Sequence, residues 1–391
     1  MFMPVFLAQP SCEKKFNRLF KGDERLKPKA ASIAILGAYP PPTGGVSVHI
    51  QRLCRQLDAR GVNHVVYNLI SNSGNGDNVI SVFRWRYFWM LKFAFTAREP
   101  VIYLLTSRIS TWLFGLFMVK VRKKRVIVRL RNSKLSDCCD RSWWHRWWIK
   151  FILSNMSAIV CVSRFLADYS EKIGIDKKKI IYAPGFVPPD VSEYENQNVS
   201  SKVWQFAKSH TPLIAANGKV EWYEDQDLYG LDHLVELAFR LKRDYPKIGI
   251  VVCFSEFLTE DARYLNQLIQ LAEEKGVTHD IFFNTVDGAF IPVLAAADLF
   301  VRPTNTDGDA NSVREALYLG VPTIASDVVE RPDGTVLFST RKINDFENKV
   351  RQVLDNDCYH KSQGKAASSP DWCRHVHNYI SFIESAARIQ T

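Results

Sequence analysis

Short apolar runs alternate with amphipathic helical patterns along most of this 391-residue chain, and the whole alternation occurs twice. The first run, residues 32–37, precedes a loop of prolines and glycines and then a helix whose apolar residues recur at Ile50, Leu53 and Leu57. Strands that alternate with helices in this way form parallel sheets covered by helices on both faces. The sequence therefore predicts an α/β protein. Its first series of strands is expected at 32–37, 65–67, 101–105, 125–130 and 158–162.

A second series follows a segment at 184–202 that is rich in proline, asparagine and serine, as linkers are. Strands are expected at 213–216, 248–253, 281–283, 299–301 and 323–325, and helices at 231–245, 262–275, 291–297 and 312–319. We predict a flexible leader at 1–30, a Rossmann-like doubly wound domain at 31–190 and a second such domain at 191–371. Because these sheets bind ligands beyond the carboxyl ends of their strands, we expect the two domains to face a central cleft.

The two halves of the chain carry opposite net charges. Residues 1–190 hold 31 Lys and Arg against 12 Asp and Glu, a net charge of +19, whereas residues 191–391 hold 20 against 29, a net charge of −9. The eight cysteines include no C-x-x-C pair, as expected in a reducing compartment. We find no signal peptide and no apolar run of the roughly 18 residues that a membrane span needs. We therefore expect a cytoplasmic protein whose halves have different partners.

Gly44 and Gly45 lie between the first predicted strand and the first predicted helix. Residues without a Cβ let the backbone approach a ligand closely, and the N–H groups that open a helix favour an anion such as pyrophosphate. A tight turn would also explain the two glycines. The loop lacks the full G-x-G-x-x-G pattern, so a nicotinamide or flavin cofactor is not supported.

A polar loop at 307–312 joins the predicted strand 299–301 to the predicted helix 312–319. Backbone N–H groups at Asn311, Ser312 and Val313 would point at a phosphate, and Glu315 could accept hydrogen bonds from ribose hydroxyls. Two alternatives remain open at this point. Ser312 and Glu315 also match a capping box, and Asp307 could be a solvated loop charge.

Asp307 and Glu315 are eight residues apart, and Glu315 opens the pattern Glu-Ala-Leu-x-x-Gly-x-Pro-x-x-Ala-Ser. This arrangement resembles the retaining GT4-type glycosyltransferases, among them those of bacterial surface polysaccharide biosynthesis. The resemblance covers nearly the whole chain after the leader and implies the GT-B fold, two Rossmann-like domains with the active site between them. Further similarities are the Gly44-Gly45 loop, the step at 160–163, Gly218-Lys219, the segment 230–234, and the segment 369–372 with the helix 372–391, which packs back on the first domain in that family.

The resemblance also implies roles for single residues. Glu315 would bind the donor ribose, Asp307 would lie near the hydroxyls of the transferred sugar, and Lys219 would neutralise diphosphate charge in place of the usual Arg. The sequence departs from the family at two positions. Tyr229 stands where the family has a second basic residue, and Arg131 replaces a frequent active-site His. We expect Arg131 or another basic side chain to compensate for the missing cation, and we assign Arg131 to the catalytic residues with Asp307.

In this family, retention is ascribed to a front-face reaction that needs no side-chain nucleophile, and no glycosidase-like carboxylate pair is evident here. The sequence Asp307-Gly308-Asp309 has D-x-D spacing, but at this position of the family it needs no metal. We therefore expect no metal and no cofactor. We expect the donor to be a nucleotide sugar that acts as substrate, and we favour a UDP-sugar over a GDP-sugar.

Aromatic and basic residues concentrate in the first predicted domain, which holds seven of the ten tryptophans. A helix that carries tryptophans beside Lys and Arg is suited to an anionic membrane surface, where each nearby basic residue adds about 1 kcal/mol. The alternative is that these rings pack the core of the first domain. We expect no nucleic-acid partner, because no RNP, KH or helix-turn-helix pattern is present. One predicted helical stripe contains Trp143, Trp144, Trp147 and Trp148, with Arg146 and Lys150 nearby.

Together these features predict a retaining, metal-independent glycosyltransferase of hexosyltransferase type. It would move a sugar from a nucleotide-sugar donor to a lipid-linked or glycan acceptor at the cytosolic face of the membrane, in biosynthesis of O-antigen, capsule or exopolysaccharide. The acidic second half would hold the donor, and the basic first half would face the acceptor and the anionic membrane. Two alternatives are a non-catalytic partner subunit that binds a nucleotide sugar or glycan, and a sugar-nucleotide epimerase.

Overall fold

The computed structural model describes residues 32–40, 45–70, 78–82, 86–106, 108–131, 134–189, 199–286, 290–307, 310–356 and 371–388. The predicted leader 1–30, Gly44 and the segment 357–370 therefore lie outside the described residues.

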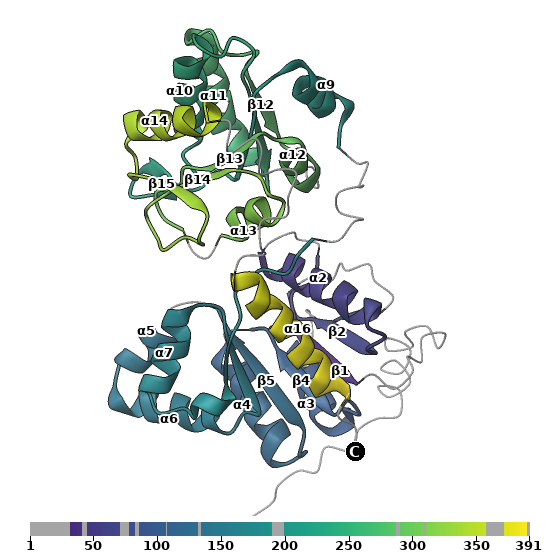
Figure 1. Cartoon of the computed structure of the whole chain (residues 1–391). Coiled ribbons are helices and arrows are strands. Elements are labelled where there is room, and N and C mark those ends of the chain that lie inside the picture. Colours follow the sequence, from purple (N-terminus) through teal and green to yellow (C-terminus); the bar gives the residue numbers. More distant parts are fainter. Residues whose placement is uncertain are drawn as a thin grey trace, which may run out of the picture.

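The first sheet has seven parallel strands in the order β3-β2-β1-β4-β5-β6-β7 (Figure 1). Strands β3 and β7 were not predicted, because each has only three residues and neither is fully buried. The strands are β1 (Ile33–Gly37), β2 (His64–Asn68), β3 (Val79–Ser81), β4 (Val101–Leu104), β5 (Arg125–Leu130), β6 (Ala158–Cys161) and β7 (Ile180–Tyr182). The helices of this part are α2 (Gly45–Ala59), α3 (Arg86–Thr96), α4 (Ile109–Lys120), α5 (Lys134–Asp140), α6 (Trp143–Ser154) and α7 (Arg164–Lys172).

The second sheet has six parallel strands in the order β12-β11-β8-β13-β14-β15. They are β8 (Leu213–Gly218), β11 (Gly249–Phe254), β12 (Ile281–Asn284), β13 (Leu299–Arg302), β14 (Thr323–Ser326) and β15 (Thr335–Phe338). The helices are α9 (Ser201–Ser209), α10 (Leu231–Lys242), α11 (Ala262–Glu274), α12 (Phe290–Ala296), α13 (Asn311–Tyr318) and α14 (Ile343–Leu354). A small antiparallel hairpin, β9 (Trp222–Tyr223) and β10 (Gln226–Asp227), follows β8. The predicted α/β class with two doubly wound sheets is confirmed.

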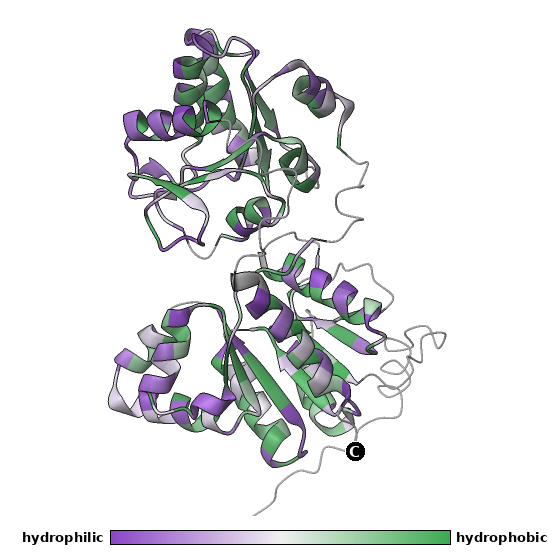
Figure 2. Ribbon diagram, viewed as in Figure 1, coloured by the Kyte–Doolittle hydropathy of each residue, from purple (hydrophilic) through white to green (hydrophobic). Residues whose placement is uncertain are grey.

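Each sheet is apolar on both faces, because each is covered by two separate core clusters. The strands are largely green in Figure 2, as expected for strands of hydrophobic residues. In β1, Ile33 and Ile35 belong to one core cluster, whereas Ala34 and Leu36 belong to the cluster on the opposite face. The same division occurs in β8 between Ile214 and its neighbour Leu213. Helices must therefore cover both faces, which leaves the carboxyl edges of the strands as the places where polar ligands can approach.

The last helix, α16 (Asp371–Arg388), packs on the first sheet beside α2 (Figure 1). The hydroxyl of its Tyr379 lies 2.8 Å from the Tyr103 hydroxyl and 3.2 Å from His49 Nε2. The guanidinium of Arg129 lies over the Tyr379 ring at 4.7 Å and donates to the carbonyl of Pro184. These buried polar contacts tie the C-terminal helix to β4 and β5 and to the segment that follows β7.

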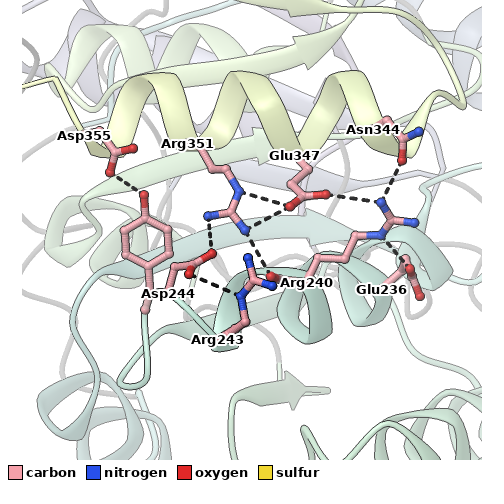
Figure 3. A network of polar contacts seen from close by, with 9 residues as sticks. Glu236, Arg240, Arg243, Asp244, Asn344, Glu347, Arg351 and Asp355 are labelled. Atoms are coloured by element: carbon pink, nitrogen blue, oxygen red, sulfur yellow. Dashed lines mark hydrogen bonds and ion pairs between the residues drawn. The ribbon is translucent and has the colours of Figure 1, made fainter.

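A network of charged side chains joins α10 to α14 on the outside of the second sheet (Figure 3). Arg351 donates to Glu347 at 2.9 Å and to the carbonyl of Arg240 at 3.1 Å, and its Nη1 lies 2.8 Å from Asp244. Tyr245 adds a hydrogen bond to Asp355 at the end of α14. The network therefore holds α14 against the domain, although α14 was not predicted from the sequence.

Replacing Arg351 by Ala should lower the free energy of unfolding by about 1 kcal/mol, because partly exposed ion pairs contribute 0.2–1 kcal/mol each. Urea unfolding followed by circular dichroism measures this difference, which should shrink in 1 M NaCl. The matched control is Arg243→Ala, whose arginine is 87% exposed and pairs only with its neighbour in the ion pairs described. Equal effects of the two substitutions would contradict a stabilising network.

Candidate active site

Helix α13 opens at the carboxyl edge of the second sheet, directly after β13. Its N-cap is Ala310, and no side chain caps it. The capping-box interpretation of Ser312 and Glu315 is therefore wrong, because a capping box would require Ser312 itself to be the N-cap. The backbone N–H groups of residues 311–313 occupy the first turn, where a helix leaves its donors without intrahelical partners. An anion is favoured at this end of the helix.

Glu315 forms a buried ion pair with Arg52 of α2. Its Oε1 accepts a hydrogen bond from Arg52 Nη1 at 2.6 Å, and the two side chains are only 8% and 4% exposed. Arg52 also donates to the carbonyl of Val187, which lies between the two sheets in the chain. Glu315 therefore has a partner from the other domain, one that the sequence did not indicate.

Further contacts lie between α13 and the first half of the chain. A Cβ on Gly45 would lie 3.8 Å from Asn311 Nδ2, and the Tyr318 ring is 5.8 Å from the Phe186 ring. The buried Oδ1 of Asn311 has no hydrogen-bond partner among the described residues. Gly45, Asn311 and Glu315, which the sequence placed in one donor site, are thus neighbours in space.

Asp307 lies at the centre of a second buried cluster. Its carboxylate accepts two hydrogen bonds from Arg302, at 3.0 and 3.1 Å, and one from Arg331 at 2.8 Å. The Thr304 hydroxyl donates to it as well. Burial alone would raise the pKa of Asp307, but the two guanidinium groups outweigh it and hold the pKa below its ordinary value. The interpretation of Asp307 as a solvated loop charge is wrong.

Tyr229 and Lys219 lie beside this cluster. The guanidinium of Arg302 lies over the Tyr229 ring at 4.9 Å, and a Cβ on Gly218 would meet the same ring at 3.0 Å. Lys219 follows β8 and forms an ion pair with Glu221 at 3.0 Å. At the position where the resemblance expects a second basic residue, the structure therefore has an aromatic ring with a buried arginine against it.

Arg131 follows β5 in the first domain, apart from this cluster. Burial and the neighbouring Arg129 lower its pKa to about 10. It carries its positive charge at neutral pH, and it helps to lower the pKa of the buried His49.

The tryptophans of α6 lie on the surface. Trp143, Trp144, Trp147 and Trp148 are 76%, 50%, 48% and 40% exposed, so the interpretation that they pack the core is wrong. The core side of α6 is formed instead by Ile149, Ile152 and Leu153. Trp147 stacks between Trp144 and Phe151, with ring centroids 5.5 and 5.7 Å apart. Two tryptophans elsewhere, Trp89 and Trp112, do pack in the core.

Sequence reasoning missed Arg302, Arg331 and Arg52. A signal existed for Arg302, which ends an otherwise apolar strand directly before Pro303. Arg52 stands among the apolar positions of its helix, next to Leu53. For Arg331 the sequence offers no comparable signal, since it lies in a loop with other charged residues, between Glu330 and Asp333.

Neither a metal cluster nor a membrane span is found in the part of the chain that the structure describes. No three His, Cys, Asp or Glu side chains there gather as metal ligands would. Likewise, no described helix combines the length and apolarity needed to cross a bilayer.

Two family models match the chain. The model described as Glycosyltransferase Family 4 matches residues 43–191, and the one described as Glycosyl transferases group 1 matches residues 226–369. Together the two ranges span most of the chain. Among curated proteins, none matches this sequence.

Solved structures resemble the chain over nearly its whole length. Anabaena HepE in complex with UDP and glucose has a TM-score of 0.62 at 12% identity, covering 90% of this chain and 100% of its own. A glycosyltransferase from Rickettsia africae has a TM-score of 0.64 at 12% identity, with 92% and 100% covered. WaaG, a glycosyltransferase involved in lipopolysaccharide biosynthesis, has a TM-score of 0.56 at 14% identity, with 92% and 99% covered.

Two parallel sheets, joined through the contact of α2 with α13, give this chain the α/β architecture of the GT-B fold. The chain belongs to the GT4-type glycosyltransferases, in agreement with both family models.

Replacing Asp307 by Asn should destabilise the protein by about 3–5 kcal/mol, because Arg302 and Arg331 would lose the carboxylate that pairs them in a buried site. The contribution of Asp307 is fully present above its unfolded pKa, about 4, and is lost as the pH falls further. Below pH 4 the free energy of unfolding should therefore decrease less in the variant than in the wild type. Urea unfolding between pH 7 and pH 3 measures both effects.

The matched control for this prediction is Asp333→Asn, which changes an exposed carboxylate in the loop that carries Arg331. Its stability should remain within about 0.5 kcal/mol of the wild type. If Asp307→Asn proves equally mild, the ion pairs do not stabilise the fold.

Proposed function

We propose that this protein is a retaining, metal-independent glycosyltransferase that uses a nucleotide-sugar donor, with UDP preferred to GDP. The observation that carries the proposal is the position of the α13 N-terminus beside Gly45, with the buried Glu315 one turn further along. This position offers N–H groups to a diphosphate and a carboxylate to a ribose. Anabaena HepE, which has a similar fold, was solved with UDP and glucose bound.

In the proposed reaction, the bond between the anomeric carbon and the diphosphate oxygen breaks. An acceptor hydroxyl forms the new bond to that carbon on the same face, and its proton passes to the departing phosphate oxygen. The protein supplies position and positive charge rather than a nucleophile. Residues 311–313 would hold the diphosphate with Gly45 opposite, and Lys219 would face its negative charge. Arg131 would extend the positive charge toward the acceptor side.

Arg52 prepares Glu315 for this role. Arg52 Nη1 donates to Glu315 Oε1 at 2.6 Å, and the pair holds the carboxylate between the domains. A carboxylate held in this way can accept hydrogen bonds from ribose hydroxyls at its second oxygen. The ion pair also links donor binding to the contact between the two domains.

We further propose that α6 attaches the first domain to an anionic membrane surface, where a lipid-linked acceptor is located. Supporting this are the four exposed indole rings, the stacked Phe151, and Lys150 on the exposed side of the helix. Indole rings suit the headgroup region, and nearby cations add attraction to anionic lipids. An acceptor for surface polysaccharide would fit this placement, and WaaG acts in lipopolysaccharide biosynthesis.

Replacing Glu315 by Gln should weaken UDP binding at least tenfold, since a charged hydrogen-bond acceptor contributes about 1.5–3 kcal/mol. The sharper measurement compares UDP with 2′,3′-dideoxy-UDP by calorimetric titration. Wild type should prefer UDP, and Glu315→Gln should lose that preference. Arg52→Met, which keeps the carboxylate but removes the buried partner that orients it, should lose only part of that preference. If Glu315→Gln still discriminates between the two nucleotides, the ribose assignment is wrong.

Replacing Trp144 and Trp148 together by Ser should reduce sedimentation with phosphatidylglycerol vesicles at least tenfold at low salt, because two interfacial anchors are lost. Phe239→Ser is the control, since Phe239 is also exposed but belongs to α10 of the second domain. Wild-type protein that does not sediment with these vesicles, or a double variant that binds as the wild type does, would contradict the membrane proposal.

A transfer assay tests the reaction itself. Purified protein with UDP-sugars and a membrane extract of lipid-linked acceptors should yield a glycosylated product whose anomeric configuration, by NMR, equals that of the donor. Donor binding without any transfer would favour the non-catalytic partner subunit. Release of free nucleotide without transfer would favour the epimerase, and an inverted product would contradict retention.

A further inference from the structure

Among the residues that the structure describes, the cluster around Asp307 contains more positive than negative charge. The side chains of Arg302 and Arg331 are 8% and 2% exposed, and the ion pairs described for both go to Asp307 alone. Their remaining donors go to uncharged acceptors, which include the side chain of Asn217 and the hydroxyl of Ser326. Two guanidinium groups thus share one carboxylate in a site nearly closed to water.

An excess charge in such a site is costly unless an opposite charge compensates it. A second carboxylate would have made the cluster neutral, but the described contacts of the two arginines include none. A cluster without Arg302 would also be neutral, because Asp307 and Arg331 would then form a simple ion pair. The arrangement is therefore the one expected where an anionic ligand completes the balance.

The position of the cluster agrees with such a ligand. Arg302 ends β13, Ser326 ends β14, and Asn217 lies one residue before the end of β8, so the cluster occupies the carboxyl edge of three adjacent strands. Ligands of open α/β sheets bind at this edge. Lys219 follows β8 at the same edge, whereas the second half of the chain as a whole carries a net charge of −9.

We propose that the Arg302–Asp307–Arg331 cluster is an anion site for the donor, and that Arg302 supplies the positive charge which Tyr229 lacks. The inference rests on the proposed function and adds the residues that face the donor's negative charge. The anionic group is the diphosphate or a carboxylate on the transferred sugar, since either would balance the same guanidinium.

Arg302 is better placed for this role than Arg331. The Arg302 side chain is more exposed than that of Arg331. Its Nε and Nη2 donate to the two oxygens of Asp307, which fix the plane of the guanidinium. The Tyr229 ring covers one face of that plane and limits the access of water. A charge that is preorganised and poorly hydrated interacts strongly with an anion. Asp307 is accordingly a positioning residue.

Replacing Arg302 by Met tests the inference through binding. The variant leaves Asp307 and Arg331 as a neutral pair, and circular dichroism checks that it folds. Its affinity for UDP-glucuronate, which carries both a diphosphate and a sugar carboxylate, should fall at least tenfold, while its affinity for uridine should stay within twofold of the wild type. Arg302→Lys, which keeps the charge, should recover part of the loss. Arg351→Met is the control. It removes a paired arginine of α14, on the outside of the second sheet, and should change neither affinity.

The source of the negative charge is decided by comparing UDP, UDP-glucose and UDP-glucuronate. A similar loss for all three in Arg302→Met assigns the diphosphate. A tenfold loss confined to UDP-glucuronate assigns the sugar carboxylate. Unchanged affinities for all three in a folded variant would overturn the inference.

Inorganic pyrophosphate separates this inference from the proposed function. It should raise the unfolding temperature of the wild type and of Arg351→Met but not that of Arg302→Met. Stabilisation by pyrophosphate without binding of any nucleotide sugar would support the anion site and contradict the glycosyltransferase proposal. Nucleotide-sugar binding that does not depend on Arg302 would support the proposed function and contradict the anion site.

Discussion

The buried ion pair between Arg52 and Glu315 is the contact on which the shared site depends. It joins α2 of the first sheet to α13 of the second, and with it the α13 N-terminus lies beside Gly45. Two charges removed from water are stable only in good geometry, so the pair favours one relative placement of the two helices. The residues expected to hold a nucleotide sugar would otherwise belong to separate surfaces.

Charge is distributed locally rather than by domain. The second half of the chain is acidic overall, yet Arg302, Arg331 and Lys219 gather where β8, β13 and β14 end. In the first half, Lys150 accompanies the exposed tryptophans of α6. The opposite net charges thus correspond to two surfaces with different tasks, one proposed for the donor and the other for the membrane. The total of +10 describes neither.

Much of the fold could be predicted because buried parallel strands are continuous apolar runs. β1, β4 and β11 lie where such runs predicted them, within one residue at most of their ends. β15 was missed because it is half exposed at the sheet edge and lacks that signal. The sequence also did not indicate which side of α6 faces the core, since Trp147 and Ile149 are both apolar. Only packing shows that the aliphatic residues are buried and the indole rings exposed.

The sequence by itself determined the α/β class, because that class follows from local periodicity. The resemblance of the residues around Glu315 to the GT4-type pattern also marked the departure at Tyr229. Tertiary structure decided the partners of the charged residues. Arg302 and Arg331 are 29 positions apart and meet at Asp307 only because β13 and β14 are adjacent. Arg52 and Glu315 are 263 positions apart and meet only where the two domains touch. Ion pairs between distant residues depend on strand order and domain contact, and neither leaves a periodic trace in the sequence.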